Sequence, residues 1–224
     1  MSLLIIIALI IFLWMASAIF SDEIKAAQDR DPAAKSSWEI LLLYPGVHAI
    51  IAYRISNLLW RIKIPFFPRL LSQLARFLTG VEIHPGAAIG RGLFIDHGMG
   101  VVIGETTIIK DNVTLFQGVT LGGTGKETGK RHPTLGDNVV VGTGAKVLGN
   151  IQVGSNSYVG ANAVVIKSVP PNATVVGVPG HITKQDGKKI DIELDHIHVS
   201  DPMMQNVVEL LKRIKILEEK IKDR

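Results

Sequence analysis

The sequence predicts a parallel β-helix over residues 83–169, and three observations indicate this fold class. Aliphatic residues recur with a period of six, glycine often follows them directly, and a small or β-branched residue often stands four positions later. The repeating aliphatic residues are Ile83, Ile89, Ile95, Ile103, Ile109, Leu115, Leu121, Leu135, Val141, Val147, Val153, Val159 and Val165. Because six is a multiple of the strand period of two, each of these side chains can point inward from stacked short strands.

A helix does not explain the repeat. Six residues turn a helix through about 600°, so the aliphatic side chains would scatter around it, and each interior glycine would cost about 1 kcal/mol. An ordinary β-sandwich would space its turns irregularly. Stacked coils instead bury one continuous aliphatic column that no single repeat could bury alone.

The composition limits the possible functions. The chain has 224 residues, enough for one domain or two small ones. Its net charge of +4 is small and its basic residues do not cluster before the last thirteen residues, so we expect no nucleic-acid partner. The chain has no cysteine, which excludes disulfides, thiolate metal sites and cysteine nucleophiles.

Residues 1–21 are an apolar N-terminal segment. The eighteen residues from Leu3 to Phe20 carry no charge, and as a helix they would span about 27 Å, enough for a bilayer. Basic residues follow this run and none precedes it, which favours a cytoplasmic location for the remainder. We expect residues 3–20 to anchor the chain to the inner face of the cytoplasmic membrane. A helix buried against a partner subunit and a true start at Met15 are the alternatives.

Residues 22–80 are predicted to be a helical domain that covers the first coil of the β-helix. Capping residues, proline and glycine set the expected helix limits, which are Ser36 or Ser37 to Leu43, His48 to about Ile62, and a last helix that ends at Gly80. Asp31 opens this region, where an ordinary role in a cap or turn competes with a functional one.

The repeat itself, placed in a domain of residues 81–180, has two departures from its period. The register slips by two between Ile95 and Ile103, across the glycine-rich residues 96–100. Eight extra residues then separate Leu121 from Leu135 and form a basic excursion. Insertions in solenoids gather on one face, which is often the functional one. The histidines at the two departures, His97 and His132, are therefore candidate functional residues.

Residues 181–224 are predicted to be a polar tail with a C-terminal amphipathic helix. Aliphatic residues after Pro202 alternate three and four apart over about two heptads, a pattern that can self-associate beside a solenoid that already forms trimers. His196 and His198 are close enough to bind a metal together, but no third ligand is evident. We therefore expect no metal site.

Several motifs make the sequence similar to the serine O-acetyltransferases of the hexapeptide-repeat acyltransferase superfamily, in their short bacterial form. The motifs are Asp96-His97-Gly98, Thr120-Leu121-Gly122-Gly123-Thr124-Gly125-Lys126, Arg131-His132-Pro133, Asp31-Pro32-Ala33-Ala34 and Tyr44-Pro45-Gly46-Val47-His48-Ala49. The resemblance covers about residues 29–184. It implies a left-handed parallel β-helix that forms a homotrimer or a dimer of trimers. It also implies acetyl transfer from acetyl-CoA to L-serine, giving O-acetyl-L-serine for cysteine biosynthesis in the cytoplasm.

The resemblance also implies roles for individual residues. His97 is the expected general base, and Glu82 stands where many members have the aspartate that orients this histidine. Asp31 and Asp96 match the residues that hold the amino group and the hydroxyl end of serine, and Arg131 matches the residue that holds its carboxylate.

Five further residues match positions that line the pocket and the cofactor groove. His132 is expected to reach the serine pocket from a neighbouring subunit. Gly123, Thr143, Gly144 and Ala161 match positions along the acetyl-CoA groove, where small residues let the pantetheine approach the backbone. The C-terminus lacks the terminal isoleucine with which many members bind O-acetylserine sulfhydrylase, so we expect a weak complex or none.

The chemistry of the residues agrees with this interpretation. A serine hydroxyl is a poor nucleophile at neutral pH and needs a positioned base, most often histidine. Three alternatives remain at this stage: an O-acetyltransferase that acts on a sugar or another small hydroxyl, a γ-type carbonic anhydrase with three histidines around zinc, and a non-catalytic trimeric scaffold.

Overall fold

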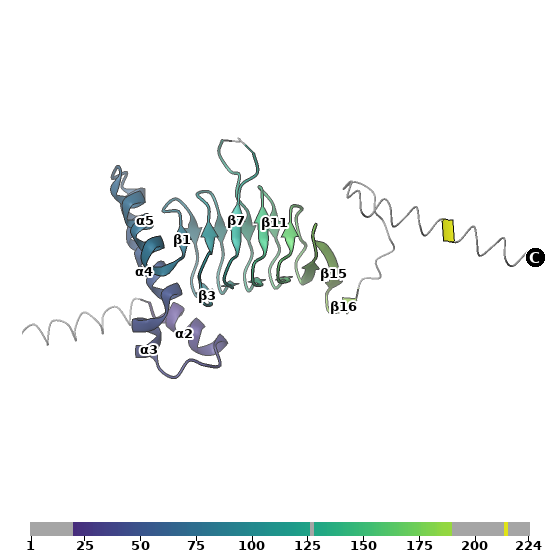
Figure 1. Ribbon diagram of the computed structural model, residues 1–224, viewed down its shortest axis with the longest axis horizontal. Helices are drawn as coiled ribbons and strands as arrows, with labels where there is room; N and C mark the ends of the chain where they lie inside the picture. The colour runs from purple at the N-terminus through teal and green to yellow at the C-terminus, as the bar shows by residue number, and fades with distance from the viewer. Residues whose placement is uncertain (1–19, 126–127, 190–212, 215–224) are drawn as a thin grey trace, which may run out of the picture. The chain divides into compact units, whose positions relative to one another are not determined.

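The computed structural model describes residues 20–125, 128–189 and 213–214. A helical region leads into a β-helix, and the excursion after β7 projects from one side of it (Figure 1). The predicted anchor lies outside the described residues except for Phe20, and the described part of the chain contains no helix long and apolar enough to cross a bilayer. The chain end that bears on sulfhydrylase binding also lies outside the described residues.

Between residue 20 and the first coil the structure describes four helices, which are α2 (Ser21–Arg30), α3 (Ser37–Leu43), α4 (Pro45–Arg61) and α5 (Phe67–Thr79). The Ser36 hydroxyl accepts a hydrogen bond from the Glu39 N–H at 3.2 Å, which confirms the predicted cap. Gly80 ends α5 in the left-handed conformation, as predicted. The expected start of the second helix at His48 is three residues late, because Pro45 begins it at the position where proline is well tolerated.

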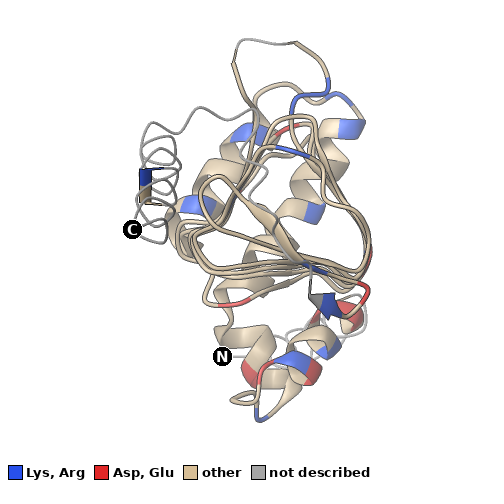
Figure 2. Ribbon diagram, turned by 90° about the vertical axis from the view of Figure 1, so that its right-hand side faces the viewer, with Lys and Arg blue, Asp and Glu red and all other residues tan. Residues whose placement is uncertain are grey.

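The coils stack into three sheets, and their outline is triangular when viewed along the β-helix (Figure 2). Sheet A contains β1 (Glu82–Ile83), β4 (Val102–Ile103), β7 (Thr120–Gly122), β10 (Lys146–Leu148) and β13 (Val164–Val165). Sheet B contains β2 (Ala88–Ile89), β5 (Ile108–Ile109), β8 (Thr134–Leu135) and β11 (Gln152–Val153). Sheet C contains β3 (Phe94–Ile95), β6 (Thr114–Leu115), β9 (Val140–Val141), β12 (Tyr158–Val159), β14 (Ala173–Val176), β15 (His181–Gln185) and β16 (Lys188–Lys189). The predicted fold class, a left-handed parallel β-helix, is confirmed.

The repeating aliphatic residues form the core. All of them except Ile89 are at most 3% exposed, and they stack in register between coils, as where Ile83 pairs with Ile103 and Ile103 with Leu121. Ile89 is only partly buried because its coil borders a cavity beneath α2 and α4. The six-residue period therefore places one aliphatic side chain inward on each short strand.

Sheet C continues beyond position 180, where the sequence predicts a polar tail. The segment β15 pairs antiparallel with β14, and β16 pairs antiparallel with β15. This hairpin covers the strand edge that the last coil would otherwise leave open. Of the predicted C-terminal helix, only Arg213 and Ile214 are described, and both are helical.

Candidate active site

The first departure from the repeat forms a loop, which we call the corner loop (residues 96–100), where the chain passes from sheet C to sheet A. His97 adopts a φ of 56°, and Gly98 and Gly100 adopt φ values of 78° and 77°. Positive φ is uncommon for a residue with a side chain. This turn absorbs the register slip and leaves the His97 side chain 73% exposed, so its ring is accessible to a substrate.

Two side chains from the helical region, Asp31 and Tyr44, lie near the corner loop. The Tyr44 hydroxyl donates a hydrogen bond of 2.6 Å to Asp31 Oδ2, while the Ala33 N–H donates one of 2.8 Å to Asp31 Oδ1. These bonds, that of Tyr44 above all, lower the pKa of Asp31, and nearby His97 lowers it further. Asp96 Oδ1 lies 3.8 Å from His97 Nε2. One chain thus brings two carboxylates and an imidazole together.

The helices are held against sheet C by one close contact and by hydrogen bonds from Arg30. A Cβ at Gly46 would lie 2.3 Å from the Ile95 carbonyl oxygen, so only glycine lets the start of α4 approach this strand end. At the end of α2, Arg30 donates hydrogen bonds to the Gly92 and Val113 carbonyls at 3.3 and 3.2 Å. Asp31 follows Arg30 directly, so these hydrogen bonds help to fix the position of the Asp31 backbone.

Glu82 is directed elsewhere in this structure. Its carboxylate forms an ion pair of 3.1 Å with Arg76 and accepts a hydrogen bond of 3.5 Å from Gln73, both on α5. Asp96 is the carboxylate that lies beside His97, 3.8 Å from its Nε2. The orienting role of Glu82 therefore stays a prediction.

The second departure from the repeat places His132 at the corner between sheets A and B. Its side chain is buried, with 7% exposure, and a Cβ at Gly104 would lie 2.1 Å from its ring. The Thr106 N–H donates to His132 Nδ1 at 3.1 Å. Burial is the main cause of its lowered pKa, so the ring is neutral near pH 7. With Nδ1 accepting, the proton resides on Nε2, which is then a hydrogen-bond donor.

Arg131 lies beside His132 at the same corner. Its Nη2 is 3.6 Å from Glu105 Oε2, and its backbone N–H donates a hydrogen bond to Thr106 Oγ1 at 3.0 Å. A Cβ at Gly123 would lie 3.3 Å from the Arg131 side chain. Gly123, which is predicted to line the acetyl-CoA groove, thus lies beside Arg131, which is predicted to bind the serine carboxylate.

The other predicted acetyl-CoA residues, Thr143, Gly144 and Ala161, lie at the sheet C to sheet A corner of later coils. Backbone hydrogen bonds stack these corners, since the Gly144 N–H donates to the Gln117 carbonyl at 2.9 Å and the Asn162 N–H to the Thr143 carbonyl at 2.8 Å. The role of these three residues in binding acetyl-CoA stays a prediction.

One chain does not bring the two histidines together. The corner loop lies where the strands of sheet A begin, and the Arg131 corner lies where they end. About four extended residues, or about 13 Å, separate these two sides of the sheet. Serine carries its ammonium and carboxylate on a single carbon atom. The two groups of predicted binding residues in one chain are therefore too far apart to hold the same serine molecule.

Sequence reasoning assigns no role to Tyr44, Thr106 or Glu105, although Tyr44 belongs to one of the motifs above. Tyr44 stands thirteen residues from Asp31, and Thr106 stands twenty-six residues from His132. No short-range pattern links such pairs, so only the folded chain reveals these contacts.

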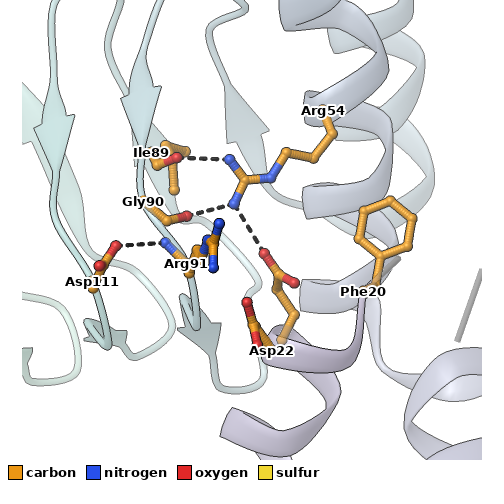
Figure 3. Close-up of a pocket in the computed structure, with 8 residues that line it drawn as sticks. Phe20, Asp22, Arg54, Ile89, Gly90, Arg91 and Asp111 are labelled. Carbon is orange, nitrogen blue, oxygen red and sulfur yellow. Dashed lines mark hydrogen bonds and ion pairs between the residues drawn. The ribbon is translucent and has the colours of Figure 1, made fainter. Parts of the chain in front are cut away.

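A cavity of about 630 Å³ lies between α2, α4 and the first coil, away from the corner loop (Figure 3). Arg54 reaches into it, donating to Glu23 at 2.9 Å and to the Ile89 carbonyl at 2.6 Å. None of the predicted site residues lines this cavity. Its arginine is engaged in joining the helices to the β-helix, so we assign it a structural role.

His84 makes the protein sensitive to acid. Burial lowers its pKa to about 4, while Trp60 packs edge-on against its ring at 5.2 Å. A lowered histidine pKa favours the folded state above pH 6.5, and this contribution is lost as the pH falls from 6.5 towards 4.

We expect the free energy of unfolding to fall by about 2 kcal/mol between pH 7 and 4.5 from this residue. Denaturant unfolding of His84→Asn, which retains an acceptor for the Gly86 N–H, should show a flatter pH dependence; an unchanged pH slope would contradict this assignment.

Comparison with known proteins identifies related enzymes. The family model of the bacterial transferase hexapeptide (six repeats) matches residues 132–167. A serine acetyltransferase of Staphylococcus aureus is 55% identical over 194 residues, which cover 87% of this chain and 91% of that protein. The match includes the predicted site.

Two solved structures are similar as well. A serine acetyltransferase of Brucella abortus in complex with coenzyme A is 44% identical with a TM-score of 0.74, covering 75% of this chain and 68% of that one. A serine acetyltransferase of Neisseria gonorrhoeae in complex with serine is 42% identical with a TM-score of 0.73, covering 76% of this chain and 69% of that one.

Proposed function

Because this chain belongs to the serine acetyltransferase family, we propose that it acetylates L-serine with His97 as the general base. The acetyl donor is acetyl-CoA and the product is O-acetyl-L-serine. The observation that carries the residue assignment is the gathering of Asp31, Tyr44, Asp96 and His97 at one corner of the β-helix. The sugar, carbonic anhydrase and scaffold alternatives lack the support of family membership.

His97 moves one proton in each half of the reaction. Its neutral imidazole takes the proton from the serine hydroxyl as the oxygen attacks the thioester carbon of acetyl-CoA. The carbon–sulfur bond then breaks, and the departing thiolate takes that proton from the imidazolium. Asp96, 3.8 Å from Nε2, stabilises the ring while it is charged.

The carboxylates beside His97 suit the ammonium group of serine. Asp31 stays ionised because Tyr44 and the Ala33 N–H hydrogen-bond its charged form, which lowers its pKa. Asp96 adds a second negative charge on the same corner. Together they favour a cation next to the base, which supports binding of the amino end of the substrate here.

The carboxylate of serine is proposed to bind at an interface between subunits. Arg131 offers a guanidinium fork and neutral His132 offers its Nε2 proton, but both lie across sheet A from His97 in the same chain. A neighbouring copy can supply this corner to the corner loop of the first. A closed trimer would repeat that head-to-tail contact three times and complete three sites.

The reaction is tested by incubating the full chain with acetyl-CoA and a panel of acceptors. We expect release of free coenzyme A with L-serine and a background rate with sugar hydroxyls. Rapid turnover with a sugar and none with serine would overturn the substrate assignment. Activity with both would show that Asp31 and Arg131 do not select an amino acid.

Tyr44 is proposed to position Asp31. In Tyr44→Phe the carboxylate loses the 2.6 Å hydrogen bond that contributes most to its low pKa, so we expect the KM for serine to rise about fivefold to tenfold. The kcat and the KM for acetyl-CoA should stay within twofold. Initial-rate kinetics check this split, and Tyr53→Phe provides a tyrosine control on the helical region. A fall in kcat with an unchanged serine KM would contradict the positioning role.

A further inference from the structure

The outer sides of α4 and α5, and the turn between them, expose large apolar side chains. The two helices pack against each other, and their inner faces cover the first coil. The exposed residues follow helical spacing on the opposite sides and continue through the connecting turn. We call them the hairpin surface, and they are Ile55, Leu58, Ile62, Ile64, Phe66, Phe67, Leu70, Leu74, Phe77 and Leu78. A patch of this kind marks an interaction site rather than scattered apolar exposure.

The turn between the helices is the most exposed part of this surface. Every residue from 61 to 67 is exposed, and the Phe66 side chain is 71% exposed. Phe66 has φ 64° and ψ −56°, and the Phe67 N–H donates to the Pro65 carbonyl at 2.7 Å, so the backbone forms a tight γ-turn. The rings of Phe66 and Phe67 pack edge to face at 5.8 Å. Two aromatic rings are thus exposed on a tight turn.

The turn between α4 and α5 carries charge of one sign, whereas two arginines on the helices pair with carboxylates, Arg54 with Glu23 and Arg76 with Glu82. Between Glu39 and Glu82 the sequence contains no acidic residue, and its basic residues are Arg54, Arg61, Lys63, Arg69 and Arg76. Arg61 and Lys63 are exposed in the turn beside the aromatic pair. An apolar turn with two exposed positive charges beside it fits a partner that is apolar inside and anionic outside.

We propose that the hairpin surface binds the face of an anionic lipid bilayer, with the turn of Phe66 and Phe67 entering the headgroup region. Aromatic and aliphatic side chains combined with basic residues are the composition that places helices at a membrane interface. The negative surface potential of the bilayer attracts Arg61 and Lys63. This contact is separate from the apolar segment before Ser21 and does not depend on the acetyl transfer.

Two other occupants fit less well. A second copy packed symmetrically on the same face would bring its own Arg61 and Lys63 against those of the first. The segment of residues 1–19 contains no charged side chain and so offers nothing to the basic edge. The charge pattern therefore favours lipid headgroups.

A single-cysteine experiment tests the contact at the turn itself. The chain has no cysteine, so Phe67→Cys can carry an environment-sensitive fluorophore at one site of the full chain. Tyr158→Cys, exposed on the distant strand β12, is the matched control. Vesicles of phosphatidylcholine, with or without phosphatidylglycerol, are titrated, and a quencher attached to the acyl chains reports depth.

We expect the label at position 67 to shift to the blue and be quenched on anionic vesicles, while the label at position 158 stays in water. Adding Arg61→Gln and Lys63→Gln should raise the lipid concentration needed by about 25-fold, at about fivefold for each basic residue. Acetyl transfer to serine should stay within twofold in all variants.

Three results would overturn the proposal. The label at position 67 could stay in water on vesicles that nevertheless sediment with the protein, which would mean that another segment binds them. It could be buried before vesicles are added, which would mean that a second copy or residues 1–19 cover the surface. It could enter neutral and anionic vesicles equally, which would exclude recognition of the charge.

Discussion

Replacing His97 with alanine is expected to lower kcat by about 10²- to 10⁴-fold, the usual contribution of a general base. The side chain is 73% exposed at the corner loop, so its removal leaves no cavity in the core. The KM for acetyl-CoA should stay within about twofold, because the groove residues Thr143, Gly144 and Ala161 lie on later coils. Steady-state kinetics with serine, compared with the melting temperature, check both statements.

The control for this variant is Glu82→Gln. If Glu82 orients His97, kcat should fall in the same direction but by less than in His97→Ala. If Glu82 serves only as the partner of Arg76, the melting temperature should drop while kcat stays the same. A stable His97→Ala protein with near-normal turnover would contradict the general-base mechanism itself.

The second large effect is expected on substrate binding. Arg131→Ala should raise the KM for serine by about 10- to 100-fold, because it removes a charge-assisted contact that is present before and during the reaction. The kcat at saturating serine should change much less. Arg131→Lys keeps the charge without the planar fork and should show a smaller rise. Arg91→Ala, at a different corner and on the first coil, should leave the serine KM unchanged, and an equal rise there would contradict a specific role for Arg131.

The same variant tests whether the site lies between subunits. His97→Ala and Arg131→Ala chains, each nearly inactive at low serine, are expressed together so that mixed trimers form. If each site takes His97 from one chain and Arg131 from the next, about a quarter of the sites in a random mixture contain both residues. Activity should therefore return to about a quarter of that of the wild type. Complementation that never exceeds the sum of the separate variants would place the site within one chain.

The sequence alone determined the fold and the places where it is interrupted. A six-residue repeat predicts which side chains face inward, and the structure buries all of the repeating aliphatic residues except Ile89. The glycine at position 80 marks the end of α5 because few other residues adopt its backbone conformation. The two breaks in the period also predict where His97 and His132 leave the coils. These features are local, so a pattern of neighbouring residues is enough to predict them.

Only the tertiary structure decided which side chains meet. Asp31 and Asp96 are far apart in sequence, and they share one corner because Gly46 lets the start of α4 approach Ile95 closely. Thr106 selects the Nε2 proton of His132 from a different coil. The ion pair between Glu82 and Arg76 on α5 likewise joins elements that no local pattern connects. Such contacts depend on how coils and helices stack, and they join residues that are tens of positions apart. A local pattern in the sequence cannot predict which of these residues meet.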